Sequence, residues 1–148
     1  MNPSKKVNHL RNFKRYSRTD NTPIKILHVD DDLNQLFFTK IFLEECDPKL
    51  IVVSTSHPKD VEYILSKERY DCLVSDYQMD EMNGIKLVEI VRKKSGVPII
   101  IYTGRGSEEI EGVARVAGAD GYVQKNTDPK HYKNLYTQIL YLIHKDYD

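Results

Sequence analysis

The chain alternates between short apolar runs and longer stretches in which apolar residues recur at helical spacing. The short runs have the length of β-strands and cover residues 24–30, 50–54, 71–76, 97–102 and 120–123. The stretches between them place apolar residues on one side of five predicted helices: Leu33, Leu36, Phe37, Ile41 and Phe42; Val61, Ile64 and Leu65; Ile85, Val88 and Val91; Ile110, Val113, Ala114 and Ala117; Tyr132, Leu135, Tyr136, Ile139 and Leu142. The pattern predicts five strand–helix pairs.

Strict alternation of strand and helix predicts a parallel sheet, because each connection between parallel neighbours must cross over one face of the sheet. The predicted strands read as nearly continuous apolar runs, as expected for strands that are buried on both faces. The expected architecture is therefore a doubly wound, three-layer α/β/α fold, and we expect the strand order 2-1-3-4-5. In such a sheet, ligands bind beyond the carboxyl ends of the strands, where the strand order reverses.

Length and composition limit the class of protein. A chain of 148 residues has the size of one domain, and 40% hydrophobic and 30% charged residues are ordinary for a globular protein. No apolar run approaches the ~20 residues of a membrane-spanning helix, and the N-terminus lacks the apolar segment of a secretory signal. These features predict a cytoplasmic protein without a membrane span.

The net charge of zero hides an uneven distribution. Residues 1–23 carry six lysines and arginines against Asp20 alone, which leaves an excess of acidic residues in the rest of the chain. This composition predicts a mobile basic N-terminal extension over residues 1–23, a domain over 24–144 and a C-terminal tail over 145–148. A basic arm can contact nucleic acid or anionic lipid, but six charges in a tail without a regular spacing of aromatic residues are weak evidence for this role. A solvated leader is favoured, and no direct nucleic-acid contact is expected.

Acidic residues follow the first and third predicted strands. Asp30 and Asp31 end the first strand, and Asp76 ends the third. If these strands are neighbours, their carboxylates converge in one crevice, where they repel and raise one another's pKa unless a cation binds. Carboxylates and water are the ligands that Mg²⁺ prefers, so a divalent metal site is predicted. Asp32 is better explained as the N-cap of the helix that follows.

The fourth and fifth predicted strands end in groups that complement these acids. Thr103 brings a hydroxyl group, Gly104 leaves space beside it, and Lys125 brings a compact cation. Such a set suits phosphoryl transfer to a carboxylate, because cations offset charge on the phosphoryl oxygens while an aspartate attacks in line.

Four motifs carry a resemblance to a known family. The runs VDDD, SDYQMDEMNG, IIIYTG and GADGYVQK resemble, in order and spacing, the receiver domain of two-component response regulators over about residues 24–144. The run from IIIYTGRGSEE to GADGYVQKNTDPKHY is further similar to receivers of archaeal sensory and hybrid histidine kinase proteins. The resemblance implies a flavodoxin-like (βα)5 fold. It also implies a phosphorelay switch that is phosphorylated by a sensor histidine kinase or a histidine phosphotransfer protein and signals to a partner or downstream domain, with a homodimer left open.

The resemblance also implies a role for each matching residue. Asp76 would be the phosphoacceptor. The ligands of Mg²⁺ (or Mn²⁺) would be Asp30, Asp31, Asp76 and the backbone carbonyl of Gln78. The phosphoryl group would be stabilised by Thr103, Lys125 and Gly104, and the conformational switch would consist of Thr103 and Tyr122.

Three positions depart from the family pattern. Asp80 and Asn126 stand where prolines are common, and Asn83 stands where an aspartate is common. Because a cis peptide bond before a residue other than proline costs roughly 3 kcal/mol, the Lys125–Asn126 bond is predicted to be trans. Gly84 is predicted to adopt a positive φ at the start of the third helix.

Two other functions fit part of the pattern. A phosphatase of the haloacid dehalogenase type also uses an aspartyl phosphate and Mg²⁺, and the run Asp30–Asp32 satisfies its D-x-D pattern. The chain has no cap insertion and no second acidic pair after the lysine, and this function leaves Asp76 without a role. A phosphate-independent scaffold with the receiver fold is suggested by the three departures. The receiver is favoured: it promotes its own phosphorylation and dephosphorylation but is not a turnover enzyme.

Overall fold

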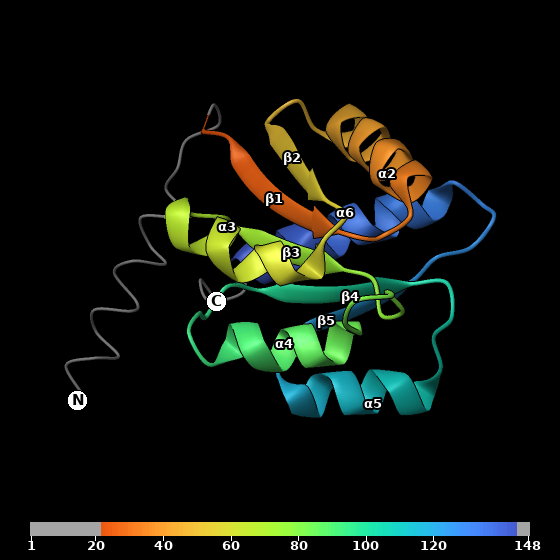
Figure 1. The fold of residues 1–148 in the computed structure, drawn as a ribbon. Helices are drawn as coiled ribbons and strands as arrows, with labels where there is room; N and C mark the ends of the chain where they lie inside the picture. Colours follow the sequence, from red (N-terminus) through yellow and green to blue (C-terminus); the bar gives the residue numbers. More distant parts are fainter. Residues whose placement is uncertain (1–21, 145–148) are drawn as a thin grey trace, which may run out of the picture.

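The computed structural model describes residues 22–144, so most of the predicted N-terminal extension and the whole C-terminal tail lie outside the described residues. Five parallel strands form one sheet in the order β2-β1-β3-β4-β5 (Figure 1). The strands are β1 (Ile24–Val29), β2 (Leu50–Thr55), β3 (Cys72–Ser75), β4 (Ile99–Thr103) and β5 (Gly121–Gln124). The predicted order is confirmed, and the direction of strand addition reverses between β1 and β3.

Helices cover both faces of the sheet, as the alternating pattern predicted. One face carries α2 (Leu33–Cys46) and α6 (Lys130–His144). The other carries α3 (Val61–Lys67), α4 (Gly84–Arg92) and α5 (Glu108–Ala117), and a short 3₁₀ helix, η1 (Pro58–Asp60), precedes α3 (Figure 1). Within residues 22–144 no helix combines the length and the apolar composition that crossing a membrane requires.

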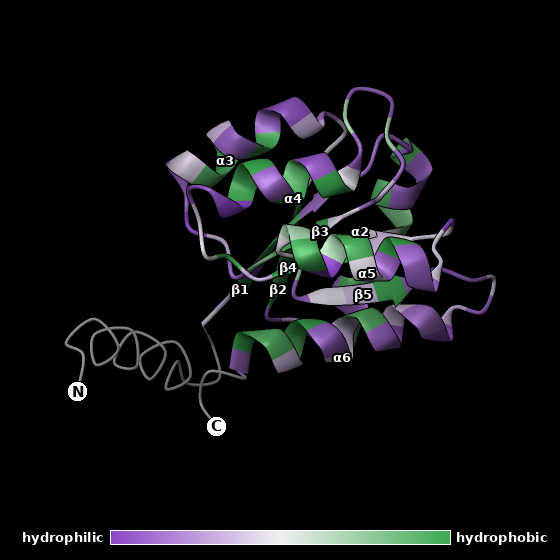
Figure 2. Cartoon of the chain, turned by 90° about the horizontal axis from the view of Figure 1, so that it is seen from below, coloured by the Kyte–Doolittle hydropathy of each residue, from purple (hydrophilic) through white to green (hydrophobic). Residues whose placement is uncertain are grey.

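The sheet separates two buried layers, and α4, α5 and α6 carry apolar residues towards these layers and polar residues away from them (Figure 2). The layer below α2 and α6 contains Leu43, Ile100, Tyr102, Leu135 and Ile139 among others. The layer below α3, α4 and α5 contains Leu27, Leu73, Leu87, Ile99 and Ile101 among others. Successive strand residues point to opposite faces, so each strand supplies both layers.

Helix α2 does not bury the side that the sequence pattern predicted. Leu33 and Phe37 were expected in the core, yet they are 69% and 60% exposed. The buried residues of the helix are Leu36, Thr39 and Leu43. Apolar residues surround most of this helix, so their spacing alone does not determine which side faces the sheet. The prediction was also wrong for Val113 of α5, which is half exposed, whereas its neighbour Ala114 is buried.

The amino end of the sheet is closed by a hydrogen-bonded network around Arg92. Its guanidinium donates to the carbonyl of Gly118 and pairs with Asp120 at 2.7 Å. The Asp120 carboxylate also accepts the backbone N–H of Ile99, so it ties the start of β4 to the segment before β5. Gly118 follows α5 with φ of 123°, a conformation that favours glycine. This network stabilises the end of the sheet that lies away from the acidic residues.

Candidate functional site

The carboxyl ends of β1 and β3 lie side by side. Val29 pairs with Ser75, and the N–H of Asp76 donates to the carbonyl of Val29 at 3.0 Å. The register therefore places Asp30 and Asp76 directly beyond neighbouring strand ends. Asp30, Asp31 and Asp76 each offer a carboxylate oxygen, and these oxygens lie within 4.8 Å of one another. The convergence expected from the sequence is present.

Asp30 is the buried member of this acidic group. Its side chain is 1% exposed; one carboxylate oxygen accepts the N–H of Asp32 at 2.9 Å, and the other accepts the ammonium of Lys125 at 2.8 Å. Burial raises the pKa of the Asp30 carboxyl, Lys125 acts against this shift, and the nearby charge of Asp76 adds to it. Asp30 is therefore a carboxylate whose charge needs a cation nearby.

Backbone N–H groups hold the other two acids. Asp31 accepts the N–H of Asp80 at 2.9 Å, and Asp76 accepts the N–H of Tyr77 at 2.8 Å. The contact from Asp80 was not expected, because this residue was noted only as a departure from the family pattern. A proline at that position has no N–H to donate, so the departure adds a hydrogen bond to a predicted metal ligand.

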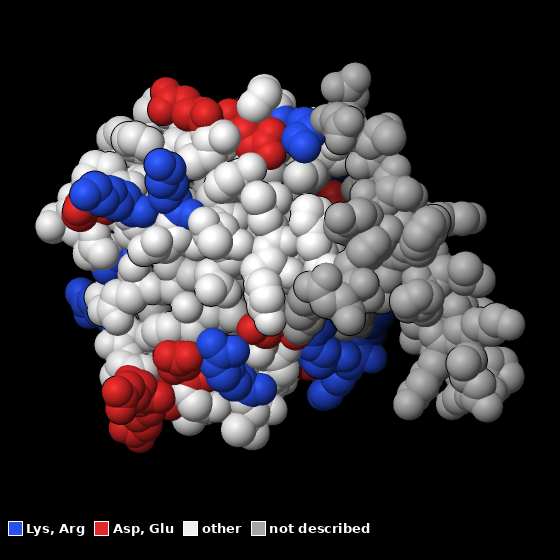
Figure 3. Space-filling view, turned by 180° about the vertical axis from the view of Figure 1, so that it is seen from behind, with Lys and Arg blue, Asp and Glu red and all other residues white. Residues whose placement is uncertain are grey.

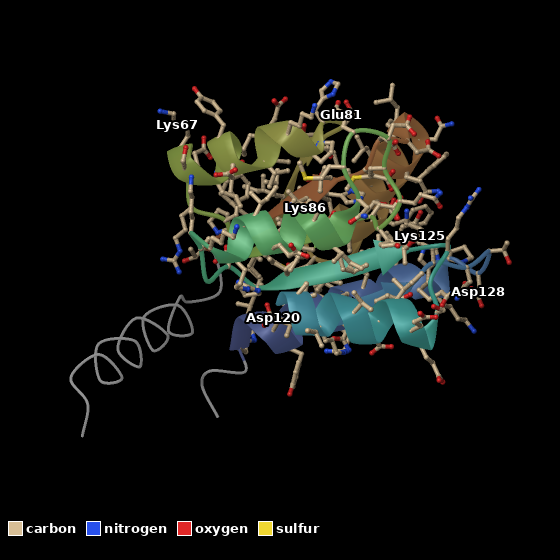
Figure 4. All side chains as sticks on the ribbon, turned by 60° about the horizontal axis from the view of Figure 1, so that its bottom comes forward. Lys67, Glu81, Lys86, Asp120, Lys125 and Asp128 are labelled. Carbon is tan, nitrogen blue, oxygen red and sulfur yellow. The ribbon has the colours of Figure 1, made fainter. Side chains whose placement is uncertain are left out.

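Lys125 reaches the acids from the end of β5. Its backbone N–H donates to the carbonyl of Thr103 at 2.9 Å, and its ammonium lies 3.9 Å from Asp76. Figure 4 shows Lys125 at the opposite end of the sheet from Asp120. The Lys125–Asn126 peptide bond is trans, as predicted, and the described part of the chain contains no cis bond.

A cleft of about 380 Å³ opens over these residues. Seven predicted site residues line it: Asp30, Asp31, Asp76, Gln78, Thr103, Gly104 and Lys125. It is also lined by four residues that were given no role there, namely Asp32, Gln35, Asp80 and Arg105. Asp32 caps α2 as predicted, because its side chain accepts the N–H groups of Asn34 and Gln35.

Tyr122, the predicted switch residue, lies beside the cleft and is not among the residues that line it. A Cβ atom added to Gly106 would lie 1.5 Å from the Tyr122 hydroxyl and 3.3 Å from the methyl group of Thr103. The tyrosine ring therefore fills the space under the β4–α5 loop, next to Thr103. Burial raises the pKa of its hydroxyl, and a contact with the backbone of Ser107 acts against this shift.

The loop between β3 and α4 approaches the cleft closely at Gly84. The prediction of a positive φ there was wrong, since Gly118 is the one residue with positive φ in the described chain. Glycine is needed for space instead: a Cβ at Gly84 would lie 2.3 Å from the backbone carbonyl oxygen of Asp76. Asn83 caps α4, with its side chain accepting the N–H of Lys86 at 2.9 Å. The loop is thus held against Asp76.

The donor atoms fit a hard divalent cation. Asp30, Asp31 and Asp76 offer oxygen alone, which suits Mg²⁺ or Mn²⁺ better than metals that prefer nitrogen or sulfur. The ammonium of Lys125 lies next to Asp30 and Asp76 and offers one positive charge to three carboxylates, so a divalent cation would offset the remaining negative charge. The cleft therefore contains oxygen ligands that suit a Mg²⁺ or Mn²⁺ ion.

Comparison with known proteins agrees with the fold. Residues 26–137 match the model of the response regulator receiver domain family, and the chain belongs to this family. Over 107 residues it is 32% identical to the transcriptional regulatory protein GlrR of Escherichia coli (strain K12), which covers 72% of this chain and 24% of the relative. Over 101 residues it is 33% identical to CpxR of Klebsiella pneumoniae subsp. pneumoniae (strain HS11286), covering 68% and 42%. The chain thus spans less than half the length of these relatives.

Solved structures show the same architecture. The chemotaxis response regulator CheY4 of Vibrio cholerae superposes with a TM-score of 0.71 at 25% identity, over 80% of this chain and 99% of that one. A CheY-like receiver domain protein of Methanospirillum hungatei JF-1 gives 0.73 at 26% identity, over 85% and 98%. The chain is therefore a receiver domain of the two-component response regulator class with the predicted flavodoxin-like fold.

Proposed function

We propose that Asp76 accepts a phosphoryl group from a sensor histidine kinase or a histidine phosphotransfer protein, and that this acyl phosphate switches the domain between two conformations. One observation carries the proposal: the carboxylates of Asp30, Asp31 and Asp76 and the ammonium of Lys125 converge in one open cleft. Phosphoryl transfer depends on positioning and on charge stabilisation, and this arrangement supplies both.

The transfer exchanges one bond to phosphorus for another. A carboxylate oxygen of Asp76 attacks the phosphorus atom, the P–N bond to the donor imidazole breaks, and the imidazole leaves with the bonding electrons and takes up a proton. Asp30, Asp31, Asp76 and the backbone carbonyl of Gln78 would hold Mg²⁺ or Mn²⁺, which offsets negative charge when bound. Lys125 adds a second positive charge beside Asp76, and Gly104 leaves the phosphoryl group room at the rim of the cleft.

Thr103 and Tyr122 are the residues that we assign to the switch. The Thr103 hydroxyl accepts the N–H of Arg105 at 3.2 Å and lies on the cleft, so a phosphoryl group on Asp76 offers it a new, charged acceptor. Movement of Thr103 changes the space available to the Tyr122 ring, because both side chains border the same narrow space at Gly106. Two positions of this ring would then report the phosphorylation state to α5 and β5.

The exposed apolar side of α2 supports a protein as the phosphoryl donor. Three large apolar residues are exposed near the start of this helix, namely Leu33, Phe37 and Phe38. They lie within one turn of Gln35, which lines the cleft. Clustered exposed apolar residues mark protein interaction sites in soluble proteins. Figure 3, which views the molecule from behind, shows a largely uncharged centre with charged residues towards the margins of this face.

A cytoplasmic location, a homodimer and the closer similarity to archaeal sensory kinases stay predictions.

The phosphatase alternative is less well supported. In a D-x-D site the second acid must be free to exchange a proton with the substrate, whereas the side chain of Asp32 caps α2 by accepting two backbone N–H groups. The scaffold alternative leaves the acidic group and its lysine without a use. We therefore infer that the domain is not a turnover enzyme.

Intact-mass spectrometry after incubation with acetyl phosphate and Mg²⁺ tests the proposal. The protein should gain the mass of one phosphoryl group, and Asp76→Asn should abolish the gain. Asp60→Asn, which removes an exposed acid of η1, is the matched control and should leave it unchanged. An undiminished gain in Asp76→Asn would refute the assignment. Steady hydrolysis of a phosphomonoester would favour the phosphatase, and failure both to gain mass and to bind Mg²⁺ would favour the scaffold.

A further inference from the structure

The buried ring of Tyr102 lies directly beneath the ammonium of Lys125. The ammonium nitrogen is 4.9 Å from the ring centroid, within the range of a cation–π contact, and Tyr102 is 0% exposed. Tyr102 is the residue of β4 immediately before Thr103 and faces the layer below α2 and α6. We propose that Tyr102 is a positioning residue for phosphoryl transfer: its ring face holds Lys125 in place beside Asp76. This inference rests on the proposed function of the site.

The other contacts of the Lys125 ammonium are with two acids that would also bind the metal ion. Lys125 lies 2.8 Å from Asp30 and 3.9 Å from Asp76, and both carboxylates belong to the group that would bind a metal ion. A divalent cation on these carboxylates weakens their attraction for a neighbouring ammonium. The Tyr102 ring has no net charge and is not a metal ligand, so its attraction for Lys125 is kept when the acids are engaged.

The backbone after Lys125 offers less restraint than a proline would. Asn126 follows through a trans bond, and the backbone of Lys125 is anchored to β4 through its own N–H. A proline fixes φ and stiffens the segment that it begins, whereas asparagine leaves that rotation free. A contact with the Lys125 side chain can therefore supply the restraint that the backbone after Lys125 lacks.

Three further rings fix the orientation of the Tyr102 ring. His131 of α6 stacks on it with centroids 5.7 Å apart and an interplanar angle of 27°. His28 lies 6.2 Å away on β1, and Tyr132 lies 6.5 Å away on α6. Tyr132 in turn stacks on Phe42 of α2 at 4.6 Å. A ring enclosed in this way cannot turn from Lys125 without moving α6 or α2.

The ring of Tyr102, and not its hydroxyl, is the part that meets Lys125. The ammonium lies over the ring, whereas the hydroxyl interacts with the side chains of Thr39 and Tyr132. Phenylalanine keeps the ring, so it should replace Tyr102 in this role.

The first test observes the contact directly by NMR and does not depend on phosphorylation. A proton over an aromatic face is shifted upfield, so the ε-CH2 protons of Lys125 should resonate upfield of those of exposed Lys86. Tyr102→Phe should keep the shift, and Tyr102→Leu should move these protons to the position seen for Lys86. Lys125 protons at the exposed-lysine position in the wild-type protein would overturn the inference, even if Tyr102→Leu failed to fold.

The second test measures the rate of phosphoryl uptake from acetyl phosphate at saturating Mg²⁺. Tyr102→Leu should slow uptake about tenfold per folded molecule, the size expected for loss of a desolvated cation–π contact. Tyr102→Phe should restore the rate to within about twofold of the wild type. Tyr136→Leu removes a ring of equal size that packs against the same layer, and Tyr136 is not one of the rings that enclose Tyr102, so this variant should keep the wild-type rate. Equal rates in Tyr102→Leu and Tyr136→Leu would overturn the inference.

The two experiments separate the inference from the proposed function. If the wild-type protein takes up no phosphoryl group, the proposed function fails, and the Lys125 shift alone decides whether Tyr102 positions the lysine. If uptake occurs and the Lys125 shift is the same in Tyr102→Leu and wild type, the function stands and the role of Tyr102 is refuted.

Discussion

The two buried layers of this domain are built from the same strands but from different chemistry. Below α3, α4 and α5 the strands present aliphatic residues such as Leu27, Leu73, Ile99 and Ile101. Below α2 and α6, the layer includes four buried polar residues, two from the strands and two from the helices: His28, Thr39, Tyr102 and His131. The aliphatic layer is the ordinary core of an α/β fold, whereas the other layer is partly polar next to the cleft.

The polar layer lowers stability by itself. Both ring nitrogens of His28 and one ring nitrogen of His131 are buried with no hydrogen-bond partner in the described chain. A buried polar group without a partner costs about 1–3 kcal/mol. The contact between Tyr102 and Lys125 gives this layer a use that aliphatic residues could not supply. One layer therefore stabilises the fold, and the other supports the site.

Lys125→Ala should give the largest effect, because it removes the group on which the polar layer acts. Phosphoryl uptake should fall by about 10²–10³-fold, the range for loss of one charged donor to a developing negative charge. Lys86→Ala is the control, because Lys86 lies on the exposed side of α4 (Figure 4). Rates of uptake from acetyl phosphate measure both. If the Lys125 variant kept a rate near that of the control, the cleft would not work as described.

Ile99→Ala should lower stability without changing the rate of phosphoryl uptake, because it opens a cavity in the aliphatic layer. Ile99 is fully buried at the start of β4, and its loss should lower the free energy of unfolding by about 3 kcal/mol. The backbone N–H that binds Asp120 is retained, so the strand end stays tied. Urea titration measures the stability, and the uptake rate per folded molecule should be unchanged. A large loss of uptake rate with little loss of stability would show that the aliphatic layer also supports the site.

Asp80→Pro tests whether the loop between β3 and α4 supports the metal site, because the N–H of Asp80 in this loop donates to Asp31. Asp80→Ala removes the same carboxylate but keeps the N–H that binds Asp31, so the pair isolates this hydrogen bond. Loss of a hydrogen bond to a metal ligand should weaken Mg²⁺ binding about tenfold in the proline variant relative to the alanine variant. Titration of Mg²⁺ by calorimetry compares them. Equal affinities would show that the Asp80 N–H does not hold Asp31 for the metal.

His28→Leu should give the smallest effect and the opposite sign. Replacing a buried ring with two unpaired nitrogens by an aliphatic residue of similar size should raise the free energy of unfolding by about 1 kcal/mol at neutral pH. Leucine still fills the space beside Tyr102, and the stacked ring of His131 continues to hold Tyr102 against Lys125, so uptake should stay near the wild-type rate. Thermal unfolding with parallel uptake assays measures both. A clear loss of stability would show that the polar layer is stabilising after all.

Much of the fold could be predicted because its signals are local. The apolar runs give the five strands, and Asp30, Asp76, Thr103 and Lys125 follow those runs directly. In a parallel sheet, residues that follow strands meet at one edge, so the convergence of the site follows from topology. The cap at Asp32 and the trans bond after Lys125 were predicted from single residues and general costs, and both are present.

Other features depend on packing that the pattern does not encode. The buried side of α2 could not be read from a helix that is apolar on most sides, and Gly84 is required by its approach to Asp76, not by its own φ. Tyr102 was visible in the run IIIYTG, but its contact with Lys125 joins two strands and depends on ring orientation. The donation from Asp80 to Asp31 comes from backbone atoms, which are the same in nearly every residue type.

The central claim is that Asp76 carries the phosphoryl group, and chemical mapping tests it most directly. Borohydride reduces an aspartyl phosphate to homoserine, which peptide mass spectrometry can locate in the chain. After incubation with acetyl phosphate and Mg²⁺, the account predicts homoserine at position 76 and at neither of the cleft acids Asp30 and Asp31. Homoserine at position 30 or 31, or none at all in protein that has gained a phosphoryl group, would contradict it.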